Sequence, residues 1–201
     1  MTMRLGLLPG AFNPPTLAHA ALAEAALRQY QLDRVIFLLP KAFPHKSYSG
    51  ASFADRMAML EELVQQRESF TAASADGLLF IDFARVFRAK LGPEAAIYLI
   101  CGRDAAQRIV EWDYGDNIPF AERLNDFPLL VASREGDYAP PADSREGIHR
   151  VKMTETFDEI SSSRVREAIA SGGEWRQHVA PPVARRIEEL GLYRTTEPAR
   201  Q

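Results

Sequence analysis

Short, almost continuously hydrophobic stretches recur along this chain. The strongest cover residues 3–8, 34–39, 95–101 and 127–133, and weaker ones cover 70–74 and 148–153. A continuous hydrophobic run is typical of a strand that is buried on both faces, as in the centre of a parallel sheet. We therefore expect these stretches to be strands of a parallel sheet.

Helical patterns lie between and after these runs, with apolar residues spaced at the helical period. They cover residues 16–30, 52–66, 78–90, 104–112, 162–171 and 181–191. Ser52 has the residue type that caps a helix, and Gly191 follows the last pattern as a helix end prefers. Strand–helix alternation predicts an α/β fold, and a length of 201 residues predicts a single domain over 1–201.

The stretches between these elements are polar or contain proline and glycine. We expect surface loops at 40–51, 113–126 and 135–147, and a frayed tail at 195–201. Ligands of open parallel sheets bind beyond the carboxyl ends of the strands. The chemistry is therefore expected at residues 9–19, 40–46 and 102–112, and from 134 onward.

Composition narrows the class of protein. The 24 basic and 27 acidic residues give a net charge of −3, which argues against broad binding to nucleic acid or to a membrane surface. Cys101 is the only cysteine, so no intrachain disulfide forms, and its apolar run predicts a buried structural thiol. The sequence has no run of about 18 apolar residues, and its first residues do not resemble a secretory signal, so we expect a cytoplasmic protein.

The stretch "LLPGAFNPPTLAHAAL", residues 7–22, joins a strand to a helix through a distinctive turn. Gly10 and Ala11 let a backbone approach a ligand closely. Thr16 and His19 are three residues apart and share one face of the first helical turn, where outward-pointing amides favour an anion. The pattern predicts a phosphate site; alternatively, Thr16 is an ordinary cap and His19 a packing residue.

A second candidate is "ISSSRVR", residues 160–166. A serine run that opens a helix satisfies first-turn amides and offers hydroxyls, and Arg166 lies four positions after Ser162 on the same face. A guanidinium with hydroxyls and helix amides suits a polyphosphate. The alternative is simple capping with a surface arginine.

Together these segments resemble the two signatures of the nucleotidylyltransferases. Gly10, Phe12, Pro14, Thr16 and His19 match the first signature, and residues 160–166 match the second. The resemblance implies a Rossmann-like sheet with a helical C-terminal part and binding of ATP with Mg²⁺, the ion bridging the phosphates with few or no protein ligands. The residues that it assigns to ATP are Gly10, Ala11, Phe12, Thr16, His19, Gly102, Asp104, Ile160, Ser162, Ser163 and Arg166.

Segments between the signatures resemble the nicotinate-mononucleotide adenylyltransferases. They include a Pro-His-Lys run at 44–46, an Arg-x-x-Met-Leu pattern at 56–60 within the following helix, and a Gly-x-Asp with a downstream tryptophan. This likeness implies acceptor contacts from His45, Lys46, Trp112 and Arg134, and a catalytic set of His19, Thr16, Lys46 and Arg166. From residue type alone, Lys46 is also compatible with a solvated charge, Asp104 with a helix cap and Trp112 with the core.

The chain departs from the family pattern at several positions. Asn13 stands where aspartate is usual, Ala18 replaces a glycine, and Thr16 is typical of the phosphopantetheine branch. A Ser-Tyr-Thr turn that helps to bind the pyridine ring is missing from residues 71–91. The expected reaction is adenylyl transfer from ATP to nicotinate mononucleotide; the alternatives are another phosphorylated acceptor, such as phosphopantetheine, or a non-catalytic nucleotide-binding protein. The sequence leaves the oligomeric state open and allows a homo-oligomer.

Overall fold

A computed structural model describes residues 2–41, 50–65, 67–76, 79–133, 138–153, 157 and 160–194. Within this part of the chain, six strands form one sheet in the order β3-β2-β1-β4-β5-β6, and every neighbouring pair is parallel. The strands are β1 (Arg4–Pro9), β2 (Arg34–Pro40), β3 (Phe70–Ala75), β4 (Ala96–Gly102), β5 (Leu129–Ser133) and β6 (Ile148–Lys152). The predicted parallel sheet is confirmed.

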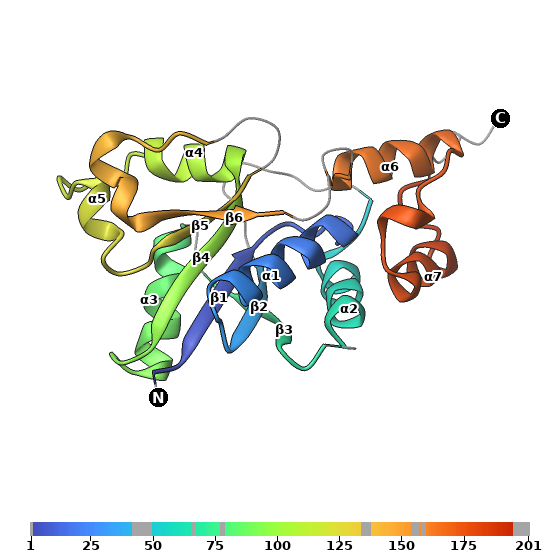
Figure 1. Cartoon of the computed structure of the whole chain (residues 1–201). Helices are drawn as coiled ribbons and strands as arrows, with labels where there is room; N and C mark the ends of the chain where they lie inside the picture. The colour runs from blue at the N-terminus through green and yellow to red at the C-terminus, as the bar shows by residue number, and fades with distance from the viewer. Residues whose placement is uncertain are drawn as a thin grey trace.

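Helices cover both faces of the sheet (Figure 1). One face carries α1 (Leu17–Gln29), α2 (Phe53–Val64), α6 (Ser162–Ser171) and α7 (Pro181–Glu189), with the short η2 (Arg176–His178) between the last two. The other face carries α3 (Phe80–Leu91), α4 (Arg103–Glu111) and the short α5 (Phe120–Arg123). Figure 1 shows α6 and α7 together on the right, beside α1 and α2. The predicted Rossmann-like arrangement with a helical C-terminal part is confirmed.

Two predicted loops contain short helices instead. The helix α5 lies inside 113–126, and η1, a 3₁₀ helix over Ala142–Gly147, lies inside 135–147. The two pack together, because a Cβ on Gly147 would clash with the Cβ of Leu124. Each has too few residues to show a helical period in the sequence, so the prediction of plain loops there is wrong.

The core consists of two apolar layers, one on each side of the sheet. Strand β2 supplies both, because Val35 and Phe37 face the α1 layer whereas Ile36 and Leu38 face the α3 layer. Cys101 lies buried in the second layer, and burial raises the pKa of its thiol to about 12. This is the structural thiol that the sequence predicts.

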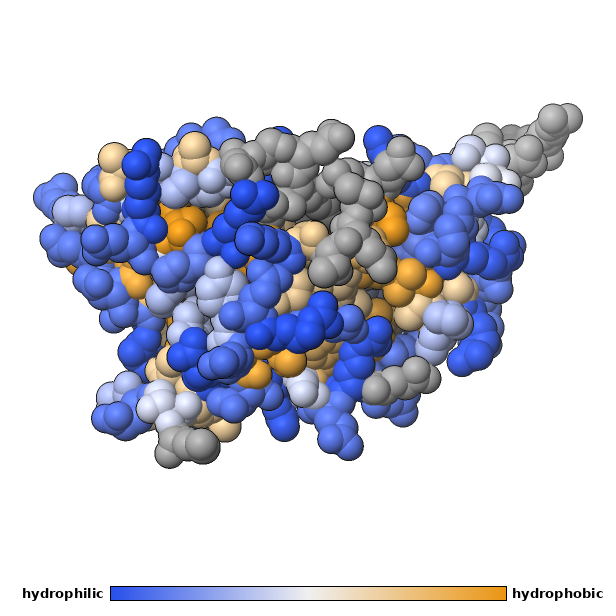
Figure 2. Space-filling model, viewed as in Figure 1, coloured by the Kyte–Doolittle hydropathy of each residue, from blue (hydrophilic) through white to orange (hydrophobic). Residues whose placement is uncertain are grey.

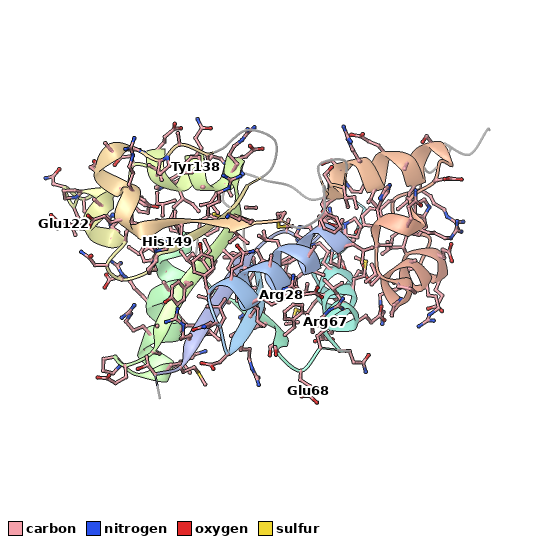
Figure 3. All side chains as sticks on the ribbon, in the orientation of Figure 1. Arg28, Arg67, Glu68, Glu122, Tyr138 and His149 are labelled. Carbon is pink, nitrogen blue, oxygen red and sulfur yellow. The ribbon has the colours of Figure 1, made fainter. Side chains whose placement is uncertain are left out.

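Ion pairs at the rim attach the helices to one another. Arg67, just after α2, places its Nε 2.8 Å from Glu24 Oε1 on α1 (Figure 3). Arg186 of α7 places its Nη2 2.7 Å from Glu62 Oε1 on α2.

Hydrophilic residues cover most of the face drawn in Figure 2, with apolar side chains between them. None of the helices in the described part of the chain is long and apolar enough to cross a bilayer.

The sheet order reverses between β1 and β4, which are neighbours in space although β2 and β3 separate them in the chain. Their carboxyl ends, at Pro9 and Gly102, therefore flank the crevice in which open α/β sheets bind ligands. Helix α1 follows one of these ends and α4 follows the other. The fold thus places the two helix N-termini at the expected site.

Candidate functional site

The turn after β1, residues 10–16, folds around Phe12. The Gly10 N–H donates to the Leu38 carbonyl at 3.1 Å, so the turn leaves the sheet only after this residue. Phe12 has a φ of 46°, uncommon for a bulky residue, and its ring is buried. A Cβ on Gly10 would lie 2.9 Å from Phe12 Cζ. The packing of Phe12 therefore favours a glycine here, and contact of Gly10, Ala11 and Phe12 with ATP stays a prediction.

Thr16 and His19 are joined directly at the start of α1. Thr16 is fully buried and is the N-cap residue of the helix. Its backbone N–H donates to His19 Nδ1 at 3.0 Å, and its Oγ1 lies 2.8 Å from the same nitrogen. The half-buried imidazole also packs edge-on to the Phe12 ring, with centroids 5.1 Å apart. Thr16 therefore caps the helix and His19 packs against Phe12, as the alternative interpretation predicts. The same contacts also orient the imidazole.

Helix α6 contacts the same turn. The Ser162 hydroxyl donates to the Pro14 carbonyl at 2.8 Å, and Arg166 Nη1 donates to the Asn13 carbonyl at 2.7 Å. Arg166 Nη2 donates to the Ser163 hydroxyl at 3.2 Å. The two predicted phosphate segments therefore lie against each other, although the pairs are 148 and 153 residues apart in the chain.

This contact brings two helix N-termini together. In each helix the third N–H of the first turn is bonded to the N-cap residue: His19 N–H donates to the Thr16 carbonyl at 3.1 Å, and Arg164 N–H donates to the Ser161 hydroxyl at 3.2 Å. The positive ends of the two helix dipoles favour an anion near these N-termini. Because a hydroxyl has a single hydrogen, Ser162 cannot donate to a phosphate while it donates to Pro14. Ser163 accepts from Arg166 and keeps its hydrogen. A phosphate contact by Ser162 stays a prediction that requires its hydroxyl to leave Pro14.

Further buried polar residues lie at the turn, and the sequence does not predict them as site residues. Arg56 of α2, 6% exposed, donates from Nη1 to the Ala11 carbonyl at 3.0 Å. The Tyr193 hydroxyl donates to Asn13 Oδ1 at 2.8 Å. The Arg-x-x-Met-Leu pattern marks Arg56 in the sequence, whereas no pattern pairs Tyr193 with Asn13.

The end of β4 lies beside the end of β1, because the two strands are neighbours in the sheet. Gly102 is the N-cap residue of α4, so the alternative in which Asp104 caps that helix is wrong. Asp104 lies in the first turn with its side chain 80% exposed, and its Oδ1 is 3.7 Å from Arg103 Nε. Trp112 directly follows α4 and is 41% exposed, so its core alternative is also wrong. An exposed carboxylate and an exposed flat ring remain compatible with the predicted nucleotide and pyridine contacts.

Three predicted residues, His45, Lys46 and Arg134, lie outside the described residues. Ile160 is half-buried just before α6, and its N–H donates to the Phe157 carbonyl at 3.0 Å.

In the part of the chain that the structure describes, no three His, Cys, Asp or Glu side chains are grouped so that they could hold a metal ion.

Comparison with known proteins identifies the family. The family model described as cytidylyltransferase-like matches residues 7–168, which include the turn, the crevice and most of α6. The chain belongs to the cytidylyltransferase-like family. Membership makes it a nucleotidyltransferase, and it resembles the adenylyltransferases in particular.

Curated relatives match over nearly their whole length. A probable nicotinate-nucleotide adenylyltransferase of Shouchella clausii is 32% identical, with 94% of this chain and 96% of the relative covered. The protein of the same name from Exiguobacterium sibiricum is 29% identical over 96% of this chain and 100% of the relative. Among solved structures, the nicotinic acid mononucleotide adenylyltransferase of Plasmodium falciparum complexed with NaAD has a TM-score of 0.76 at 15% identity, covering 95% of this chain and 97% of that chain. The structural likeness supports the family's fold.

Proposed function

We propose that this chain transfers the adenylyl group of ATP to the 5′-phosphate of nicotinate mononucleotide and releases pyrophosphate. The names of relatives that match it end to end support this reaction. The structural observation that carries the proposal is the hydrogen bond from Arg166 to the Asn13 carbonyl, which brings the second signature to the first. A single triphosphate can then be held by residues from both ends of the chain.

In this proposal the phosphates of ATP lie between α1 and α6. Ser163 and Arg166 bind the β and γ phosphates, and Thr16 and His19 lie at the α-phosphate. Gly102 and Asp104 lie beside the nucleoside, across the crevice from α1. The substrate is ATP with its Mg²⁺, which neutralises part of the phosphate charge.

The chemical step is a direct displacement at phosphorus. An oxygen of the acceptor's 5′-phosphate attacks the α-phosphorus, the bond from this phosphorus to the bridging oxygen breaks, and pyrophosphate leaves with the bond electrons. No covalent enzyme intermediate is needed, so the protein contributes positioning and charge stabilisation. His19 donates to the phosphate on which charge develops, Thr16 holds its ring, and Lys46 offsets charge between the two substrates.

The acceptor is the finer part of the proposal. His45, Lys46, Trp112 and Arg134 are proposed to contact it, and the exposed Trp112 ring has a face on which a pyridine can stack. One observation favours a second candidate: Thr16 is typical of the branch that adenylylates phosphopantetheine. The acceptor therefore has to be tested together with the reaction.

The experiment is an assay of pyrophosphate release by the purified full chain with MgATP and each acceptor separately. Nicotinate mononucleotide, nicotinamide mononucleotide and phosphopantetheine form the panel, with an ATP-only control for background hydrolysis. We expect the fastest release with nicotinate mononucleotide. Fastest release with phosphopantetheine would support the second candidate, adenylyl transfer to phosphopantetheine. ATP binding without release from any acceptor would show a non-catalytic nucleotide-binding protein.

A further inference from the structure

A buried hydrogen bond connects the far end of the chain to the turn after β1. The Tyr193 hydroxyl donates to Asn13 Oδ1 at 2.8 Å, and the two residues are 8% and 3% exposed. They are 180 residues apart in the chain. A buried polar pair of this kind is costly to disrupt, since either group left alone loses its partner without regaining water.

Asn13 also accepts a hydrogen bond from Arg166. Its side chain accepts from Tyr193, while its backbone carbonyl accepts from Arg166 Nη1 at 2.7 Å. One residue of the turn therefore receives both the α6 arginine and the segment that follows α7. Because the side chain and the carbonyl are joined at the same Cα, a bond that holds the Asn13 side chain restricts movement of the carbonyl that accepts from the guanidinium.

The environment of Tyr193 holds its ring in one place. A Cβ on Gly50 would lie 2.5 Å from the ring, and the Tyr193 backbone itself has a φ of 64°. Burial raises the pKa of Tyr193, and the nearby charges of Arg166 and Arg56 act in the opposite direction. The hydroxyl thus stays protonated, as a donor, and lies near two guanidinium groups.

Arg56 supports the same turn from α2. Its Nη1 donates to the Ala11 carbonyl at 3.0 Å. The carbonyls of Ala11, Asn13 and Pro14 are then each bound by a donor from another element. The side chain of Asn13 is the point at which the residues beyond α7 join this arrangement.

We propose that Tyr193 is a positioning residue for the triphosphate: its hydroxyl holds Asn13, and Asn13 in turn holds the Arg166 guanidinium at the turn after β1. The inference rests on the proposed function for the identity of the ligand, ATP. An arginine side chain loses considerable rotamer freedom when it binds a phosphate, and a guanidinium that is already oriented loses less. Loss of the Tyr193 hydroxyl should therefore weaken ATP binding without removing any group that touches ATP.

The test is the substitution Tyr193→Phe, with Tyr30→Phe as the matched control. The Tyr30 hydroxyl also makes one hydrogen bond to the protein, to the Arg150 carbonyl at 2.6 Å, where the end of α1 meets β6. We expect Tyr193→Phe to raise the Kd for MgATP and the KM for ATP by about threefold to tenfold, with kcat little changed; the free energy of the lost hydrogen bond is the upper limit of this effect. Tyr30→Phe should leave the Kd for MgATP unchanged.

The double variant with Arg166→Ala decides whether Tyr193 acts through the arginine. We expect Tyr193→Phe to have no further effect on the Kd for MgATP once Arg166 is alanine. An equal effect in both backgrounds would overturn the inference. A lower melting temperature with an unchanged Kd would also overturn it, because it would show a purely structural role.

Asn13 provides a second route if Tyr193→Phe does not fold. Asn13→Ala removes the side-chain acceptor and should raise the Kd for MgATP in the same way, whereas Asn13→Asp keeps an acceptor for the hydroxyl and should bind MgATP more tightly than Asn13→Ala. Equal Kd values for the two would overturn the inference.

The titrations with MgATP contain no acceptor, so they test ATP binding separately from the reaction. Wild-type protein that binds ATP but releases no pyrophosphate with any acceptor would contradict only the proposed reaction.

Discussion

Thr16 holds one nitrogen of His19 from two directions: its backbone N–H lies 3.0 Å from Nδ1, and its hydroxyl oxygen lies 2.8 Å from the same atom. Because the N–H donates, Nδ1 is an acceptor, and in the neutral ring the hydrogen is on Nε2. The first turn of α1 thus fixes both the orientation and the tautomer of the imidazole. This makes His19 a donor through Nε2 in the proposed reaction.

Replacing His19 by alanine should remove that donor. We expect kcat to fall by about a hundredfold or more, as for the loss of a single donor to transition-state charge. The assay is pyrophosphate release at saturating MgATP and acceptor. His149→Ala is the control, since His149 lies on β6 with its ring near Tyr30, centroids 5.9 Å apart (Figure 3). Unchanged turnover in folded His19→Ala protein would reject the assignment of His19.

Thr16→Val keeps the shape of the side chain and removes only the hydroxyl. The backbone N–H of residue 16 still donates to His19 Nδ1, so the ring should keep most of its orientation. We expect kcat to fall by about threefold to tenfold, the effect of one hydrogen bond. A loss as large as that of His19→Ala would show that the hydroxyl does more than hold the imidazole.

Arg166→Ala should mainly weaken ATP binding. The guanidinium donates to the Asn13 carbonyl and to Ser163, and hydrogen bonds from a charged group contribute more than neutral ones. We expect the KM for ATP to rise by about tenfold to a hundredfold, with a smaller change in kcat. Arg164→Ala, on an exposed position of the same helix, is the control and should have a KM near that of the wild type. An ATP constant that Arg166→Ala does not alter would contradict the role.

The sequence located the strands because burial on both faces leaves a continuous apolar run. Strand β2 begins at its predicted Arg34, and β3 begins at Phe70 although its run is weak. The helix that contains Thr16 and His19 was equally predictable, since its first turn carries a recognisable signature. These features depend on neighbours in the chain, which the sequence displays directly.

Other features depend on how distant segments meet, and the sequence does not display this. The small size of Gly10 suggests room for a ligand, yet the space is filled by Phe12, because Phe12 turns back with a positive φ. The pairing of Tyr193 with Asn13 has no spacing that could reveal it. Residue type alone also left Trp112 open between the core and a stacking role, and only its exposure decides against the core.

The buried thiol of Cys101 should make stability depend on alkaline pH. Burial raises its pKa from 9.0 to about 12, so between these values the folded state holds a proton that the unfolded state has lost. Its contribution is complete below pH 9.0, and the unfolding free energy should fall above it by about 1.4 kcal/mol per pH unit. Urea unfolding from about pH 8 to about pH 10.5 measures this slope. Cys101→Ala should show a shallower slope, and identical slopes for the two proteins would contradict the burial of the thiol.

Two glycines of the crevice should respond differently to the same added methyl group. At Gly10 the new Cβ would lie 2.9 Å from Phe12 Cζ, inside a buried cluster, so Gly10→Ala should lower the unfolding free energy by about 1–3 kcal/mol through overpacking. At Gly102 no described residue other than its immediate chain neighbours has an atom within 4 Å of the new Cβ. Alanine is a poorer N-cap than glycine, but this costs less than about 1 kcal/mol.

The two variants therefore separate packing from binding. Because Gly102 is proposed to lie beside the nucleoside, Gly102→Ala should raise the Kd for MgATP while its urea midpoint stays close to that of the wild type. Calorimetric titration with MgATP and urea unfolding on the same preparations measure both quantities. Wild-type stability of Gly10→Ala would contradict the packing of Phe12 against Gly10. Wild-type ATP affinity of Gly102→Ala would instead place the nucleoside away from the end of β4.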